Sequence, residues 1–299
     1  MPRRASTSAF HPGLGLRVRM WIALALNALL LAFLLVGAYG LLWTEGGWAV
    51  LVFFAVFALL GVRSGTVRRR SRPSDPHVPP EVARRATRAV SRLSLVADLT
   101  VPVTVVVPDA APVSWTTARP RRRPRVHVTT GLLEQLDDAQ LEAVIAHELS
   151  HIGNRDAVLM TILAAPGVLV LRGFRAVIYD SGIDLVEKLS MLLYGCIYLP
   201  PAMVSAGLSR IVSRHRELAA DRGAALLTGS PAALAAALMR LSDGLHAIPD
   251  RDLRRVAAAD VLHVVPAKPA SGIRRLWATH PRLGRRLREL ERLEARLQA

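Results

Sequence analysis

The sequence predicts a mainly helical protein with a small β-sheet, an α+β fold that also carries transmembrane helices. Long uncharged apolar stretches occur in the 299-residue chain, of which 52% is hydrophobic. Short runs rich in β-branched residues at 103–107 and 125–129 are typical of strands. The chain has one cysteine, which excludes an internal disulfide framework, a four-cysteine zinc site and an iron–sulfur cluster. A metal site built from histidine and carboxylate ligands remains open.

The N-terminal part predicts a transmembrane hairpin at 21–62 after a basic N-terminus at 1–20. The uncharged run 21–43 has 23 residues, which is long enough for a membrane helix, and a second apolar run follows a short turn. A secretory signal peptide would have a shorter apolar region that ends in a cleavage site. Arginines flank both outer ends of the hairpin, whereas the turn carries only Glu45. The positive-inside rule therefore places both ends in the cytoplasm.

The net charge of +16 has two interpretations, nucleic-acid binding or a bias toward arginine combined with charge that flanks membrane helices. The sequence shows no helix-turn-helix pattern, zinc-finger spacing or aromatic RNA-binding motif. We therefore expect a lipid bilayer as a partner, and no nucleic acid.

A proline-rich linker at 63–80 precedes the region 81–299, in which the first predicted element is a basic amphipathic helix at 81–95. The two predicted strands follow. Between them, the arginine-rich segment 118–125 is expected to form the loop of a hairpin, either solvated or in contact with lipid headgroups.

A second membrane hairpin is predicted at 157–208, where two apolar stretches flank a loop at 172–188 that lacks a basic excess. The first stretch, 157–171, would form only ~22 Å of helix against ~30 Å of hydrocarbon. A buried helical hairpin in a soluble core is the alternative. After it, Ser230-Pro231 predicts a helix start, and a leucine stripe at 283–297 predicts a packing face.

The strongest local pattern is HELSH at 147–151, which follows a possible capping box that begins at Asp137. On a helix, residues four apart lie on the same face, so His147 and His151 can bind one zinc ion. Glu148 can then act as general base toward a water molecule at the metal. The alternative is a pair of ordinary surface histidines.

Zinc in a hydrolase takes three protein ligands and keeps one open position, and the HELSH motif supplies only two ligands. Position 157 is Ala, so a third histidine does not follow at the spacing of the longer zinc motif. Glu217 is the best candidate, with Asp221 one turn later to orient an imidazole. His215 is an alternative ligand, and Glu217 as a surface carboxylate paired with arginine is another interpretation. Two apolar segments separate the HELSH motif from Glu217. Whether neither or both of them cross the membrane, the motif and Glu217 lie on the same, cytoplasmic side.

Several motifs in the same order resemble the HtpX-like integral-membrane zinc metallopeptidases, a family that also includes the CAAX prenyl proteases. The similarity covers residues 80–290, and the matching segments are 128–134, 141–156, 216–221 and Thr279-His280-Pro281. The resemblance implies a zincin-like catalytic domain at the membrane and a zinc-dependent endopeptidase activity, with one zinc ion per chain.

Carried over residue by residue, the resemblance implies metal ligation by His147, His151 and Glu217. It implies Glu148 as the catalytic base and Asp221 as a residue that supports a ligand.

Two further residues match family positions near the C-terminus, His280 and Arg286, and either is a candidate to stabilise an oxyanion. A packing histidine is the alternative for His280. One departure concerns the stretch before the HELSH helix, where the family carries Asn and this chain reads VSWTT at 113–117. If that edge strand holds the substrate backbone, Val113 in place of Asn alters peptide selection and leaves the metal site untouched.

The predicted function is a multi-pass cytoplasmic-membrane zinc endopeptidase that cleaves membrane or misfolded polypeptides at the cytoplasmic face. A role in protein quality control is what the resemblance implies, and the oligomeric state stays open. One alternative is a CAAX-type processing protease. Such an enzyme needs a lipid-lined chamber, and the four predicted membrane spans are few for building one. The other is a non-proteolytic zinc-binding sensor or scaffold, against which Glu148 argues because a pure binder needs no base.

Overall fold

The computed structural model confirms a mainly helical chain with a small β-sheet, and it describes residues 14–42, 78–118, 121–164, 185–246 and 281–299. Internal contacts divide the chain into two compact units. The first, here called the sheet unit, comprises 1–13, 70–158 and 213–299. The second, here called the long-helix unit, comprises 14–69 and 159–212.

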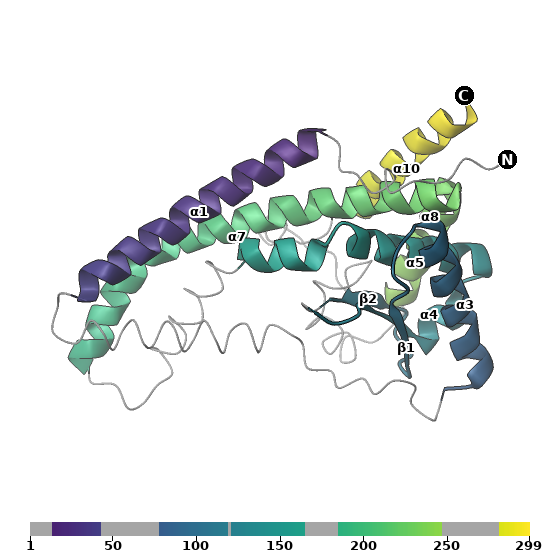
Figure 1. The fold of residues 1–299 in the computed structure, drawn as a ribbon, viewed down its shortest axis with the longest axis horizontal. Helices are drawn as coiled ribbons and strands as arrows, with labels where there is room; N and C mark the ends of the chain where they lie inside the picture. Colours follow the sequence, from purple (N-terminus) through teal and green to yellow (C-terminus); the bar gives the residue numbers. More distant parts are fainter. Residues whose placement is uncertain (1–13, 43–77, 119–120, 165–184, 247–280) are drawn as a thin grey trace. The chain divides into compact units, whose positions relative to one another are not determined.

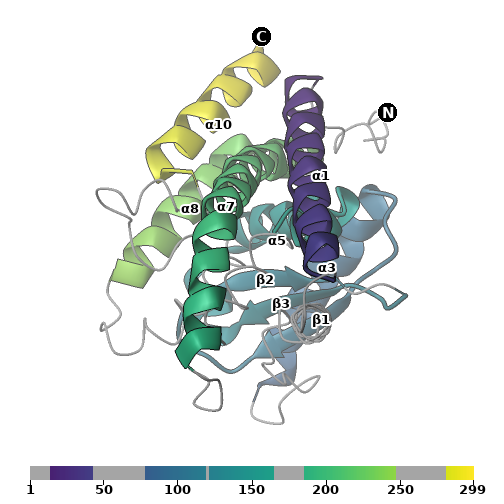
Figure 2. The ribbon, with the colours of Figure 1, turned by 90° about the vertical axis from the view of Figure 1, so that its left-hand side faces the viewer.

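In the described part of the sheet unit, three strands form a sheet: β1 (Val103–Val107), β2 (Ser114–Thr117) and β3 (Arg125–Thr129). Their order is β1-β3-β2, so β2 lies at an edge (Figure 2). β1 pairs with β3 in parallel and β2 pairs with β3 antiparallel. Both predicted strands are confirmed, but they do not form a hairpin with each other. The arginine-rich segment instead connects β2 to its antiparallel neighbour β3, so it is the loop of a hairpin between these two strands. A parallel pair such as β1 and β3 needs a longer connection.

The helices that surround the sheet begin at recognisable sequence signals. α3 (Pro80–Val96) starts with proline at its first position and confirms the helix predicted at 81–95. α4 (Thr130–Gln135) is capped by the Thr129 side chain. α5 (Asp138–Gly153), which carries the HELSH motif, begins with the predicted capping box at Asp137.

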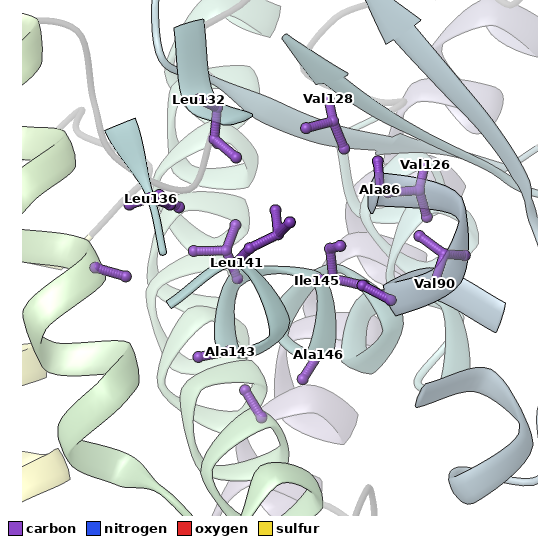
Figure 3. Packing of buried hydrophobic residues seen from close by; sticks show 14 of the residues in the cluster. Ala86, Val90, Val126, Val128, Leu132, Leu136, Leu141, Ala143, Ile145 and Ala146 are labelled. Atoms are coloured by element: carbon purple, nitrogen blue, oxygen red, sulfur yellow. The ribbon is translucent and has the colours of Figure 1, made fainter. Parts of the chain in front are cut away.

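α5 is the central helix of the core. It contacts α3 and β2, and it also contacts α8 (Pro231–His246) (Figure 1). Its side chains are buried on nearly every face from Leu141 to Ser150, and the buried set includes the polar residues His147, Glu148 and Ser150. Figure 3 shows Leu141 and Ile145 of this helix among the residues of the cluster that α3 and the sheet also supply.

The C-terminal part of the sheet unit confirms two sequence predictions. α8 begins at the predicted Ser230-Pro231 start, and α10 (Leu283–Gln298) packs its leucine stripe on the core. Leu290 is buried and Leu293 packs against the same cluster, whereas Leu297, at the end of the stripe, is half exposed.

In the long-helix unit, α1 (Leu14–Leu42) and the first part of α7 (Leu185–Thr228) are the described long helices. The proline pair Pro200-Pro201 does not end α7, which continues as helix through 44 residues. Each proline removes one backbone donor, but the flanking residues are strong helix formers. Buried polar groups join the elements of this unit, since Ser205 Oγ donates to Asn27 Oδ1 at 2.5 Å and Ser209 Oγ to Leu163 O at 2.9 Å.

The described parts of the chain contain no helix with the combined length and apolar content that a membrane crossing requires. The segment 43–62 of the first predicted hairpin and the segment 165–184 of the second lie outside the described residues. The membrane spans at 21–62 and 157–208 therefore stay predictions.

Gly131, in the first turn of α4, allows a close approach of the backbone. A Cβ atom at this position would lie 2.0 Å from the carbonyl oxygen of Ala110. We expect Gly131→Ala to lower the free energy of unfolding by about 1–3 kcal/mol, because overpacking forces the backbone to shift. Thermal unfolding of the detergent-solubilised full chain measures this effect.

The matched control is Gly284→Ala on α10. The nearest atom to a Cβ there is the end of the Arg288 side chain at 3.8 Å. This variant should keep or slightly raise stability, because Ala is the better helix former. A Gly131→Ala protein as stable as the wild type would show that the contact with Ala110 is not a tight one.

Candidate metal centre

The two histidines of the HELSH motif face each other on one side of α5. Their rings meet edge to face, with centroids 4.7 Å apart and an interplanar angle of 88°. Nε2 of His147 lies 3.1 Å from Nε2 of His151. The His147 side chain is 1% exposed and that of His151 is 20% exposed. The helical spacing therefore brings both Nε2 atoms to one point, as the sequence predicted.

Glu217 of α7 reaches the same point, 66 residues after the second histidine in the chain. Its carboxylate oxygens lie 3.8 Å from Nε2 of His147 and 3.6 Å from Nε2 of His151. One ligand atom from each of the three residues falls within 4.8 Å of the others. Among the described residues, His215 is not a member of any such group.

The carboxylates that face the two Nδ1 atoms indicate which ring nitrogens are available for a metal. Nδ1 of His147 lies 2.9 Å from Oδ1 of Asp221, and Nδ1 of His151 lies 2.7 Å from Oδ2 of Asp156. Ionised carboxylates only accept, so each Nδ1 carries the proton and each Nε2 presents a lone pair. In the neutral imidazoles, the two Nε2 lone pairs and the Glu217 carboxylate would then converge on one point. Such a set fits a cation, and this mixture of imidazole and carboxylate suits zinc.

Glu148 is held by two hydroxyl groups of the edge strand β2. Ser114 Oγ donates to Oε1 at 2.9 Å, and Thr116 Oγ1 donates to Oε2 at 2.5 Å. Alternate residues of a strand share a face, which directs both hydroxyls to the same carboxylate. Glu148 is only 2% exposed. Neither Ser114 nor Thr116 was predicted as a partner of Glu148, and only the alternation of residues along this short strand could have indicated them.

Asp221 is bound by a buried arginine from α10. Arg286 donates from Nε and Nη2 to the two Asp221 oxygens at 2.7 and 2.5 Å. Burial raises the pKa of Asp221, but Arg286 and His147 outweigh it and hold that pKa below its usual value. Burial likewise lowers the pKa of Arg286, and the coulombic attraction of Asp221 dominates and raises it.

Arg286 therefore lies behind Asp221, with Nη1 3.9 Å from Glu217. Arg286 thus lies at the site as predicted, but its Nε and Nη2 atoms bind the Asp221 carboxylate and do not face a position where an oxyanion could form. His280, the other candidate for an oxyanion, lies outside the described residues.

We expect Arg286→Met to destabilise the fold by about 3–5 kcal/mol, because it leaves Asp221 as an uncompensated buried charge. Arg288→Met, on an exposed position of the same helix, should change stability by no more than about 0.5 kcal/mol. Chemical unfolding of both variants measures the difference. Equal stabilities would mean that the buried ion pair contributes nothing to the fold.

Asp156 has an arginine partner as well, which sequence analysis also missed. Arg216 of α7 forms an ion pair with Asp156, and its Nη2 donates to the backbone oxygen of Asn154 at 3.1 Å. Burial lowers the pKa of Arg216 to about 10, so the guanidinium stays charged at neutral pH. The Asn-Arg-Asp sequence at 154–156 is part of the family resemblance, but nothing in it assigned a role to the aspartate.

A buried histidine of the sheet lies apart from the metal centre. The His127 ring stacks on Trp115 with centroids 4.8 Å apart, and its Nε2 lies 3.1 Å from Thr117 Oγ1. Burial, and then the charge of Arg125, lower the pKa of His127 to about 4.

This shift predicts a pH dependence of stability. The folded-state pKa is about 4 and the reference value is 6.5, so the unfolded chain binds the proton first. The contribution of His127 is fully present above pH 6.5 and is lost as the pH falls toward 4, at up to about 1.4 kcal/mol per pH unit. His127→Phe keeps the stacking and removes the titration. The stability difference between the two proteins, measured by unfolding between pH 7 and 4, should therefore change with pH, and a constant difference would contradict the assignment.

Comparison with known proteins agrees with the resemblance that the motifs indicated. The chain matches the model of peptidase family M48 over residues 76–294. It is 37% identical over 293 residues to the protease HtpX homolog of Moorella thermoacetica, covering 95% of this chain and 96% of that protein. It is 35% identical over 311 residues to protease HtpX homolog 1 of Streptomyces coelicolor, covering 97% and 96%.

A solved structure shares the fold. The crystal structure of S. mikatae Ste24p matches with a TM-score of 0.51 at 16% identity, and the match covers 92% of this chain and 67% of that one.

Proposed function

Because this chain belongs to peptidase family M48, we propose that it is a zinc-dependent endopeptidase whose zinc ion is held by His147, His151 and Glu217. The observation that carries the proposal is the convergence of Nε2 of His147, Nε2 of His151 and the Glu217 carboxylate, with one ligand atom from each residue within 4.8 Å of the others. Zinc sites of hydrolases use three such ligands and leave one position open.

Zinc at this site would polarise the scissile carbonyl group and lower the pKa of a water molecule toward ~7. The residues of the chain supply the proton transfers. Glu148 accepts a proton from the attacking water and delivers it to the leaving nitrogen as the C–N bond breaks. Ser114 and Thr116 hold the Glu148 carboxylate in place from β2.

Among the described residues, β2 lies at an edge of the sheet, which provides a place for an extended peptide because an edge strand leaves backbone groups unpaired in the sheet. Val113, which stands before β2 where the family carries Asn, is bound to Thr129 through both its N–H and its carbonyl oxygen. Its side chain is part of the hydrophobic core. We infer that Val113 anchors the edge strand and does not itself select the peptide.

We propose that the long-helix unit attaches the enzyme to the cytoplasmic membrane. α1 exposes large apolar side chains, among them Trp21, Leu29 and Val36, and α7 exposes Val204. Exposed apolar surface of this kind supports contact with lipid. The arginines that flank the predicted hairpin support a cytoplasmic catalytic site, where membrane or misfolded polypeptides would be cleaved as part of protein quality control.

Fractionation and reporter fusions test this attachment. The chain should resist extraction from membranes by alkaline carbonate. A reporter fused after Arg72 should lie in the cytoplasm, whereas a reporter inserted within 172–188 should not. Release by carbonate would remove the membrane proposal. A periplasmic signal from the first fusion would reverse the orientation.

The peptidase proposal is tested by digestion of casein with the detergent-purified full chain. Cleavage should occur with zinc, stop after the metal is removed by chelation, and return when zinc is added. A prenylated tetrapeptide substrate separates the CAAX-type alternative, since cleavage of that peptide alone would support it. No cleavage of either substrate by a zinc-loaded chain would favour a sensor or scaffold.

A further inference from the structure

We propose that Asp156 and Arg216 act together as positioning residues for the zinc ligand His151. This inference rests on the proposed zinc site. Neither residue contacts the metal or the substrate in this account. They act through the imidazole ring, and they repeat at the second histidine what Asp221 and Arg286 do at the first.

The two arrangements have the same chemistry. In each, a ring Nδ1 faces a carboxylate, and a buried arginine neutralises that carboxylate. At His151 the distance from Nδ1 to Asp156 Oδ2 is 2.7 Å. Asp156 is 6% exposed and Arg216 is 4% exposed, so their ion pair is shielded from water. A hydrogen bond of this kind fixes the tautomer and the orientation of a metal-binding imidazole.

The backbone after α5 is shaped to bring Asp156 to the ring. Arg155 has a φ of 55°, the left-handed region, which costs a residue other than glycine about 1–2 kcal/mol. The N–H of Asn154 still bonds to Ser150 O, and that of Arg155 bonds to Ile152 O. The helix is therefore interrupted at Asn154 and Arg155 before it resumes at Asp156, whose carboxylate lies against the His151 ring five positions earlier. Strain of this sort persists where the surroundings enforce it.

Arg216 also connects the two helices that supply the ligands. It directly precedes Glu217 on α7, and it donates to the backbone oxygen of Asn154, the C-cap of α5. One guanidinium group thus binds the end of the helix that carries two ligands and lies next to the third. By joining α7 to the end of α5, Arg216 holds the Glu217 carboxylate close to the two imidazole rings.

His151 depends on its carboxylate partner more than His147 does. The His147 ring is 1% exposed and is also restrained by packing, whereas His151 is 20% exposed. A ring with open space beside it has more freedom to turn once its hydrogen bond is lost. We therefore expect the effect of losing Asp156 to appear in metal affinity.

The experiment measures zinc affinity of the detergent-purified full chain by competition with a chromophoric chelator. Asp156→Ala should weaken zinc binding by about 10–100-fold, the usual effect of removing such a partner. Asp156→Asn keeps an acceptor oxygen without the charge and should lose less, and Arg216→Met should lose about as much as Asp156→Ala. The control Asp243→Ala, an exposed carboxylate of α8, should bind zinc like the wild type.

Cobalt(II) in place of zinc gives a second readout, because its visible spectrum reports ligand geometry. A merely structural role for Asp156 would leave the spectrum of the folded fraction unchanged, whereas a turned His151 ring should shift it. Should Asp156→Ala fail to fold, Asp156→Asn carries the same test.

Wild-type affinity and spectrum in the variants would overturn this inference and leave the zinc site intact. Failure of the wild type to bind zinc would instead refute the proposed function.

Discussion

Glu148→Gln is expected to lower the rate of peptide-bond cleavage by about 10²–10⁴-fold while zinc stays bound, because an amide cannot accept the proton of the attacking water. The substitution keeps the size of the side chain. Its oxygen still accepts from one β2 hydroxyl, and the other hydroxyl can turn to accept from the amide nitrogen. The fold and the metal ligands should therefore be retained, so that the loss reports on the base alone.

The measurement is kcat/KM on a quenched fluorescent peptide, together with the zinc content of the same samples. Glu134→Gln is the matched control, because Glu134 is an exposed glutamate of α4. It should keep wild-type activity. A Glu148→Gln enzyme that retains full activity would show that another group serves as the base.

Glu217→Ala is expected to weaken zinc binding by more than ~100-fold, because loss of a ligand should exceed the loss caused by removing a partner of a ligand. Two histidines alone leave half of a tetrahedral site to water. Dialysis against a weak chelator followed by metal analysis measures the retained zinc. Activity should fall with it and should return only at high zinc concentration.

His215→Ala provides the contrast, because it lies two positions earlier on the same helix and is not part of the described cluster. This variant should keep its zinc through the same dialysis. If His215→Ala loses the metal and Glu217→Ala retains it, the third ligand has to be reassigned.

Local patterns were sufficient to predict the elements that carry most of the site. The capping box at Asp137 and the spacing of the HELSH motif fixed where α5 begins and which side chains share a face. Strand β2 was recognised only through the family resemblance. It has four residues, Ser-Trp-Thr-Thr, and three of them are polar, so neither its length nor its hydrophobicity stands out.

Contacts between distant polar residues set the limit of prediction. Glu217 could be proposed because the HELSH motif supplies only two of three ligands. It lies in a predicted helical stretch, and Asp221 follows it one turn later. Ser114 and Asp156 carry no such local pattern, because a serine or an aspartate is ordinary at any surface position. Their roles follow from the packing of α5 against β2 and from the left-handed turn at Arg155, which only the folded chain reveals.

Anomalous X-ray scattering at the zinc edge, from crystals of the zinc-loaded full chain, tests the metal site most directly. We predict one peak per chain, about 2.0–2.2 Å from Nε2 of His147, Nε2 of His151 and a carboxylate oxygen of Glu217. A zinc-saturated crystal without density between these three side chains, or with a different residue as third ligand, would contradict this account.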